Sequence, residues 1–110
     1  MKTLNAYQLE AARTANGSDE SRQVYGALGV AGEAGEVADL IKKQHFHGHD
    51  ADRGAVAREL GDVLWYVSLL AGAYGYTLEE IAQINIEKLH QRYPDGFDMA
   101  RSRERGADDS

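Results

Sequence analysis

Residues 30–41 read VAGEAGEVADLI and carry two patterns in one segment. The apolar side chains recur at spacings of four, three and four, at Val30, Ala34, Val37 and Ile41. This spacing predicts a helix with one apolar face. Glu33 and Glu36 border that face, and residues three apart on a helix are surface neighbours. The segment is therefore predicted to present a pair of carboxylates beside the stripe that faces the core.

A second pair of acids, Glu59 and Asp62, opens the segment ELGDVLWY of residues 59–66. It belongs to another predicted helix, 52–74, with its own apolar stripe. The first of these two helices is expected at 21–46, so the connection between them is short. A short connection predicts an antiparallel helical hairpin. If the two acidic patches face each other, four carboxylates converge.

Four converging carboxylates repel and raise one another's pKa values, which is tolerable only where cations occupy the site. Oxygen ligands without cysteine favour the hard ions Mg²⁺ or Mn²⁺. Such an ion bridges protein and phosphates and lowers the pKa of a bound water. For a single acidic pair, an ordinary solvated helix face is the better interpretation. Two pairs on consecutive helices, each beside an apolar stripe, favour a metal site.

The rest of the chain also reads as helix. One segment is predicted at 3–15, before Asn16-Gly17, and another runs from the capping box of Thr77 and Glu80 to Tyr93, where Pro94 ends it. No run alternates β-branched and polar residues as a strand would. The predicted fold class is all-α, a four-helix-type bundle built on the antiparallel hairpin. Residues 1–98 are predicted to form one domain and residues 99–110 a charged, flexible tail.

Glycines recur every third residue of the second predicted helix, a glycine row formed by Gly26, Gly29, Gly32 and Gly35. Each interior glycine costs about 1 kcal/mol relative to alanine. Close approach of another helix, within the subunit or across an interface, is the favoured explanation. With a core as small as 110 residues allow, this row favours a homodimer or homotetramer.

Composition limits the partners. The net charge of −6 argues against a nucleic-acid polymer, but not against a single nucleotide, because a metal reverses the local sign. No apolar run approaches the roughly 18 residues of a membrane span, and the N-terminus lacks the pattern of a signal peptide. We therefore expect a cytoplasmic protein with no membrane partner.

Three elements together resemble the signature of the MazG-like nucleoside triphosphate pyrophosphohydrolases. They are residues 32–37 (GEAGEV), 59–66 (ELGDVLWY) and 85–94 (NIEKLHQRYP), within a resemblance that covers about 7–97. The family pattern is E-x-x-E, a variable spacer, then E-x-x-D. The resemblance implies a helical bundle that works as a dimer or tetramer and cleaves a nucleoside triphosphate between its α and β phosphates, releasing monophosphate and pyrophosphate.

The resemblance also implies roles for the acids. It implies that Mg²⁺ is held by Glu33, Glu36, Glu59 and Asp62. Glu36 and Glu33 are then the catalytic candidates, and Glu36 is expected to orient the attacking water. Asp39 continues the same acidic series and is a candidate for an additional metal.

Cationic residues are candidates for the phosphates. Asn85, Lys88 and Arg92 are spaced by three and four, so they share a helical face suited to a triphosphate. A solvated surface stripe is the alternative, and Arg92 could equally pin the turn at Tyr93. Lys43 follows the acidic stripe and is a further phosphate candidate, although a lysine near a helix C-terminus is favourable without any function.

The aromatic and histidine residues are ambiguous. Trp65, the only tryptophan, can stack on a base, but a core or interface role is favoured, and Tyr66 shares this ambiguity. His45, His47 and His49 are interpreted as solvated residues or as a contact to substrate, because no acidic or cysteine partner has ligand spacing.

Two other functions are weighed against the hydrolase. A di-iron carboxylate bundle uses Glu-x-x-His on two helices, and this chain has one such pattern, Glu87 to His90. A non-catalytic helical oligomer that binds a partner would have no need to keep mutually repelling acids together. No residue indicates the preferred base or sugar.

Overall fold

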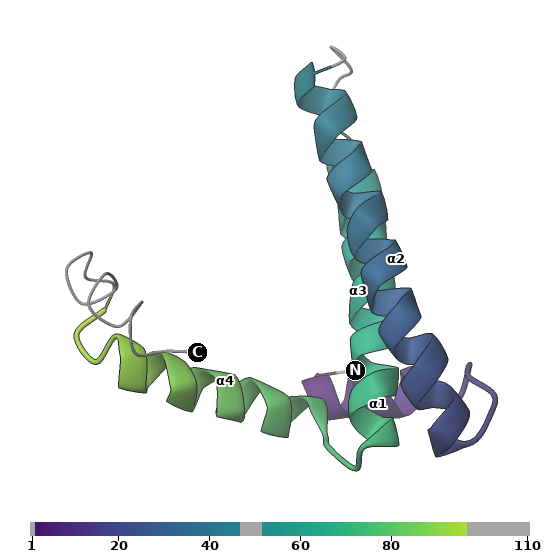
Figure 1. The fold of residues 1–110 in the computed structure, drawn as a ribbon, viewed down its shortest axis with the longest axis vertical. Coiled ribbons are helices and arrows are strands. Elements are labelled where there is room, and N and C mark those ends of the chain that lie inside the picture. Colours follow the sequence, from purple (N-terminus) through teal and green to yellow (C-terminus); the bar gives the residue numbers. More distant parts are fainter. Residues whose placement is uncertain (1, 47–51, 97–110) are drawn as a thin grey trace. The chain divides into compact units, whose positions relative to one another are not determined.

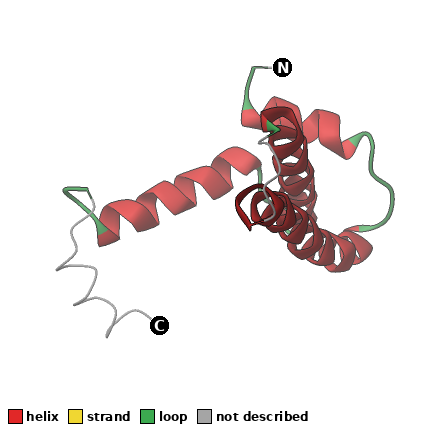
Figure 2. Ribbon diagram, turned by 90° about the horizontal axis from the view of Figure 1, so that it is seen from above, coloured by secondary structure: helices red, strands yellow, loops and turns green. Residues whose placement is uncertain are grey.

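The computed structural model describes residues 2–46 and 52–96, which form helices and no β-strand. The helices are α1 (Leu4–Ala12), α2 (Asp19–Phe46), α3 (Arg53–Ala73) and α4 (Leu78–Arg92), as Figure 1 shows. Figure 2, coloured by secondary structure, shows the same all-helical composition. The predicted all-α class is confirmed. The predicted tail, residues 99–110, lies outside the described residues, as do His47 and His49.

The chain divides into two compact units, the first ending at Leu78 and the second beginning at Glu79. Helices α1, α2 and α3 make up the first unit, and α4 belongs to the second. In the described part of the chain, no helix is long and apolar enough to cross a membrane.

The ends of the first two helices differ from the prediction. α1 stops at Ala12 rather than Ala15, because the amides of Thr14 and Ala15 bond three residues back, to Ala11 O and Ala12 O at 3.0 and 3.2 Å. These shorter-range bonds tighten the last turn and end the α-helix. α2 begins at Asp19, two residues before the predicted start, because the Ser18 hydroxyl accepts a hydrogen bond from Ser21 N at 3.2 Å and so caps the helix.

The limits of the other two helices agree with the prediction to within about one residue. Asp52 caps α3, its carboxylate accepting a hydrogen bond from Ala55 N at 3.0 Å, and Tyr74 is the C-cap. α4 begins directly after Thr77 and ends at Arg92, just before the Tyr93-Pro94 pair. Its first turn is acidic and its last turn is basic, which suits the helix dipole.

α2 and α3 form the predicted antiparallel hairpin (Figure 1). Gly26 lies against Leu70, where an added Cβ would be 3.2 Å from the leucine Cβ. One turn further along α2, a Cβ at Gly29 would overlap the ring of Tyr66. Close packing within the subunit therefore accounts for two of the four glycines in the glycine row. At Gly32 and Gly35 an added Cβ would meet nothing within 4 Å.

α1 packs on α3 through side-chain hydrogen bonds. The Gln8 amide donates to Ser68 O at 3.0 Å and to Tyr76 O at 3.1 Å, and its oxygen accepts from Leu78 N at 2.9 Å. At the other end of α1, Trp65 Nε1 donates to Thr14 Oγ1 at 2.9 Å. Among the described residues, α1 contributes one buried residue, Ala11, and α2 one, Gly26; the others are Ser68, Leu69, Ala71 and Ala73 at the C-terminal end of α3, and Leu78.

Away from this junction, the hairpin leaves large apolar side chains exposed. Leu28 is 69% exposed on α2 and Leu60 is 52% exposed on α3. The core of the first unit is thus small and concentrated where α1 meets α3.

Candidate metal centre

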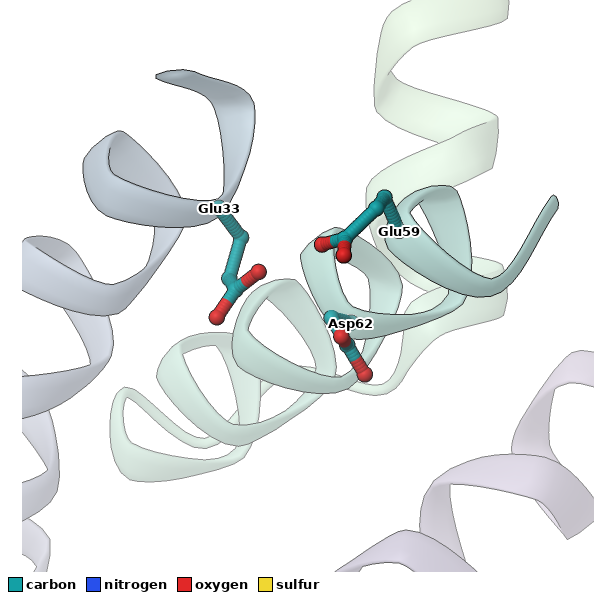
Figure 3. A group of neighbouring side chains, drawn as sticks. All are labelled: Glu33, Glu59 and Asp62. Atoms are coloured by element: carbon teal, nitrogen blue, oxygen red, sulfur yellow. The ribbon is translucent and has the colours of Figure 1, made fainter. Parts of the chain in front are cut away.

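Three of the four predicted acids lie together between α2 and α3. Glu33 comes from α2, and Glu59 and Asp62 come from α3. Each offers a carboxylate oxygen, and these oxygens all lie within 4.8 Å of one another. Figure 3 shows the Glu33 and Glu59 side chains extending toward each other from the two helices, with Asp62 beside them. We refer to these three residues as the acidic cluster.

The register of the hairpin places the acidic cluster. Gly29 of α2 packs against Tyr66 of α3. Because the two helices are antiparallel, Glu33, one turn after Gly29, lies opposite Asp62, one turn before Tyr66. Glu59 lies one turn before Asp62 on the same face of α3. Glu33 and Glu59 are half-buried, whereas Asp62 is exposed. The cluster is therefore open to solvent on the Asp62 side.

The electrostatics of the acidic cluster are unfavourable for three full negative charges. Partial desolvation raises the pKa of the Glu33 carboxyl, and a hydrogen bond with Glu59 and the charges of Asp62, Glu59 and Glu36 raise it further. The cluster thus favours a proton on Glu33 when nothing else compensates its charge. A cation would supply the same compensation.

The donor set fits a divalent hard cation. Three carboxylates from two rigid helices offer only oxygen atoms, which Mg²⁺ and Mn²⁺ prefer. Mg²⁺ typically binds through a few carboxylates and leaves its other positions to water and to substrate phosphates. The open side of the cluster leaves room for those ligands.

Glu36, the fourth predicted acid, is not part of the acidic cluster. It lies one turn beyond Glu33 on α2 and is exposed. Its charge nevertheless contributes to the raised pKa of Glu33, so its carboxylate lies within electrostatic reach of the cluster. Asp39, the next acid in the series, pairs instead with Lys43 at 3.0 Å, and both side chains are about half exposed.

Trp65 is held by the packing of α1 on α3. Besides its hydrogen bond to Thr14, its ring meets that of Tyr66 edge to face, with centroids 4.9 Å apart and an interplanar angle of 89°. Tyr66 in turn fills the space left by Gly29. These contacts favour the interpretation of both aromatic residues as packing residues.

The remaining predicted residues lie on α4 and at the end of α2. Asn85, Lys88 and Arg92 are on α4, in the second compact unit; the first two are exposed and Arg92 is half-buried. His45 is exposed in the last turn of α2.

Tyr7 was not among the sequence candidates, yet the charge of Asp62 acts on its phenol. Burial raises the pKa of its phenol, and the charge of Asp62 raises it further. Nothing in the local pattern of α1 indicates this position, because it depends on how α1 docks on α3.

Comparisons with known proteins agree with the motif. Residues 26–97 match the family model of the MazG nucleotide pyrophosphohydrolase domain. The chain is also similar to the gene 37 protein of Mycobacterium phage L5, at 34% identity over 102 residues, which cover 81% of this chain and 87% of that protein. No solved structure matches the chain at a significant level. The family match begins at Gly26, so α1 precedes it.

Proposed function

The chain belongs to the MazG nucleotide pyrophosphohydrolase family, and on that basis we propose that it is a Mg²⁺-dependent nucleoside triphosphate pyrophosphohydrolase. The substrate is an NTP or dNTP, cleaved between its α and β phosphates to give the monophosphate and pyrophosphate. The observation that carries the proposal is the meeting of Glu33, Glu59 and Asp62 oxygens within 4.8 Å. These residues occupy positions of the acidic motif that resembles the family's own.

In this proposal, the acids divide into ligands and a base. Glu33, Glu59 and Asp62 hold the divalent ion, which when bound polarises phosphoryl oxygens and makes a bound water more acidic. Glu36 lies outside the cluster but within electrostatic reach of it, so its carboxylate is available to orient the attacking water and accept its proton. Glu33 is the second candidate for that role. Mn²⁺ is expected to substitute for Mg²⁺.

Cationic residues are proposed to bind the phosphates. Lys43 has an exposed ammonium whose partner, Asp39, is equally exposed. A pair of this kind is weak and is readily exchanged for a phosphate contact. On α4, Asn85, Lys88 and Arg92 share a face that combines an amide with two cations. Trp65 stays a candidate for contact with the base through its ring face.

Self-association is part of the proposal. The exposed apolar residues of the hairpin, such as Leu28 and Leu60, and the small core support a homodimer or homotetramer. We expect a protein of the cytoplasm, where its nucleotide substrates are found.

A product assay tests the function directly. The protein is incubated with each NTP and dNTP, with and without Mg²⁺, and pyrophosphate is separated from orthophosphate. Monophosphate plus pyrophosphate, formed only with the metal, is the expected result, and the panel also ranks bases and sugars. Glu59→Gln provides the matched inactive variant. Folded protein that cleaves no nucleotide in excess Mg²⁺ or Mn²⁺ would contradict the proposal and favour a non-catalytic binding module.

A further inference from the structure

The side chain of Trp65 is directed toward the turn of α3 that carries the exposed acid of the cluster. Residues three or four apart on a helix are surface neighbours, so Asp62 and Gly61 are the neighbours of Trp65 one turn earlier in α3. A helical side chain leans toward the N-terminus of its helix and covers the preceding turn. The indole therefore borders the acidic cluster on its Asp62 side, where the cluster is open to solvent.

Contacts with two other side chains fix the orientation of the indole. Its Nε1 donates to Thr14 Oγ1 at 2.9 Å, and the Thr14 hydroxyl is itself oriented because it donates to Ala11 O at 2.8 Å. The Tyr66 ring meets the indole edge to face, an arrangement that covers at most one face of either ring. Trp65 is only half-buried. The contacts that pack the indole thus hold it in one orientation and leave part of its surface accessible.

The position four residues before Trp65 has no side chain. Gly61 is exposed, and a Cβ added there would meet nothing within 4 Å, so the indole does not fill this space. A glycine inside a helix lowers its stability relative to alanine, and at Gly61 no close packing requires it, in contrast to Gly26 and Gly29. An open space therefore lies between a rigidly held aromatic ring and the turn that carries Asp62.

We propose that this space is a nucleobase site, in which the base stacks on the accessible face of Trp65 above Gly61 while the triphosphate reaches the ion held by the acidic cluster. The inference rests on the proposed function and adds where the base binds. Every nucleobase has a face that stacks on aromatic side chains, and a ring that is already fixed loses little freedom when a base binds. Thr14 is then a positioning residue, because its hydroxyl orients the indole without touching the nucleotide.

The fluorescence of Trp65 gives a direct test, because it is the only tryptophan of the chain. The full-length protein with Mg²⁺ is titrated with the α,β-methylene analogues of ATP and UTP, in which the bond to be cleaved is replaced. Inorganic tripolyphosphate, which has no base, is titrated in parallel. We expect at least one analogue to quench the fluorescence and tripolyphosphate to leave it nearly unchanged.

Variants of Gly61 test the open space. Gly61→Leu fills it and should weaken binding of the analogue by about 5- to 150-fold, the range that loss of one base–aromatic stack implies, without weakening tripolyphosphate binding. Gly61→Ala should have a smaller effect in the same direction. Gly32→Leu is the matched control, because it also replaces an exposed glycine with open space around it, but on α2. Calorimetry measures the affinities, and thermal unfolding should show both leucine variants to be at least as stable as the wild type.

Thr14→Val provides a second readout that a merely structural role would not move. It should raise KM for nucleotides several-fold, with kcat and the affinity for tripolyphosphate unchanged.

The outcomes separate the nucleobase site from the reaction. An analogue that binds without changing the fluorescence, or equally well to Gly61→Leu, would overturn the nucleobase site and leave the proposed function standing. A lower unfolding temperature of Gly61→Leu would also overturn it, since Gly61 would then be a packing residue. Analogue binding that depends on Gly61, without hydrolysis of any nucleotide, would support the nucleobase site and contradict the proposed reaction. If neither analogue binds, the nucleobase site is wrong, and the product assay decides the reaction separately.

Discussion

Two neighbouring parts of the α2–α3 hairpin differ in what they contribute. In the first, Gly26 and Gly29 pack against Leu70 and Tyr66, and the helices approach closely without any charge. One turn further along α2, the same helices hold the acidic cluster, whose members repel one another. The glycine part stabilises the hairpin, and the acidic part destabilises it unless a cation or proton is present. We infer that the packing at the glycines sets the distance at which the carboxylates meet.

The strongest test of this division is to neutralise one acid of the cluster. Glu59→Gln is expected to lower turnover by at least about 100-fold, because removal of a direct ligand should exceed the typical effect of its supporting residues. Stability should not fall, since the change removes a repelling charge. Hydrolysis and thermal unfolding are measured together.

Glu10→Gln is the control for this test, since Glu10 makes only an exposed ion pair with Arg13 at 3.7 Å. It should leave both turnover and stability nearly unchanged. Unfolding of the Glu59→Gln protein would contradict the claim that the acidic cluster does not stabilise the hairpin. Normal hydrolysis by this variant would contradict the claim that the cluster is needed for the reaction.

The glycine part can be tested with a pair of identical changes on one helix. Gly29→Ala forces a methyl group into the Tyr66 ring and should destabilise the protein by about 1–3 kcal/mol. Gly32→Ala meets nothing within 4 Å and should stabilise it by up to about 1 kcal/mol through helix propensity. Urea unfolding gives both values.

Gly29→Ala should also weaken Mn²⁺ binding, because separation of the helices moves Glu33 away from Glu59. If both alanine variants were stabilised alike, the close approach at Gly29 would be wrong. Unchanged metal affinity in a destabilised Gly29→Ala protein would break the link between packing and the acidic cluster.

A smaller effect is expected where α1 joins the hairpin. Trp65→Phe removes the hydrogen bond to Thr14 Oγ1 and should cost about 1 kcal/mol of unfolding free energy. A double-mutant cycle with Thr14→Val measures the coupling between the two side chains. Additive effects of the two substitutions would mean that the bond contributes nothing to stability.

The smallest effect concerns pH. The pKa of Glu33 is higher in the folded protein than in the unfolded chain. Ionisation of Glu33 therefore destabilises the metal-free folded protein at pH values above its folded-state pKa. This loss of stability disappears as the pH falls through the folded-state pKa to the lower pKa of the unfolded chain. Glu33→Gln should remove this part of the pH dependence, and saturating Mg²⁺ should mask it near neutral pH. Thermal unfolding of both proteins across pH, without and with Mg²⁺, checks the sign. A wild-type protein that loses stability relative to Glu33→Gln on mild acidification would contradict it.

Local signals predicted most of the fold. The apolar spacing from Val30 to Ile41 and the short connection before Asp52 were sufficient for the antiparallel hairpin, since both depend on nearby residues. The end of α1 at Ala12 was missed because bonds to residues three back replaced α-helical ones.

The site was predicted only in outline. Spacing placed Glu33 and Glu36 on one face of α2, but the hairpin register, set by Gly29 against Tyr66, decides which of them meets Glu59. That register is a tertiary property, so a helical period cannot supply it. The effect of the Asp62 charge on the pKa of Tyr7 depends in the same way on how α1 docks.

The three hydrogen bonds of the Gln8 side chain have a consequence for the order of folding. They join residues 60, 68 and 70 positions apart in the sequence, so each closes a long loop. Closing such loops costs chain entropy, and that cost falls once the hairpin has brought the ends together. Gln8 should therefore engage after the folding barrier, so that Gln8→Leu accelerates unfolding while refolding proceeds at nearly the wild-type rate. The contacts of α1 then slow unfolding and so prolong the lifetime of the folded state, while they have little effect on the folding rate.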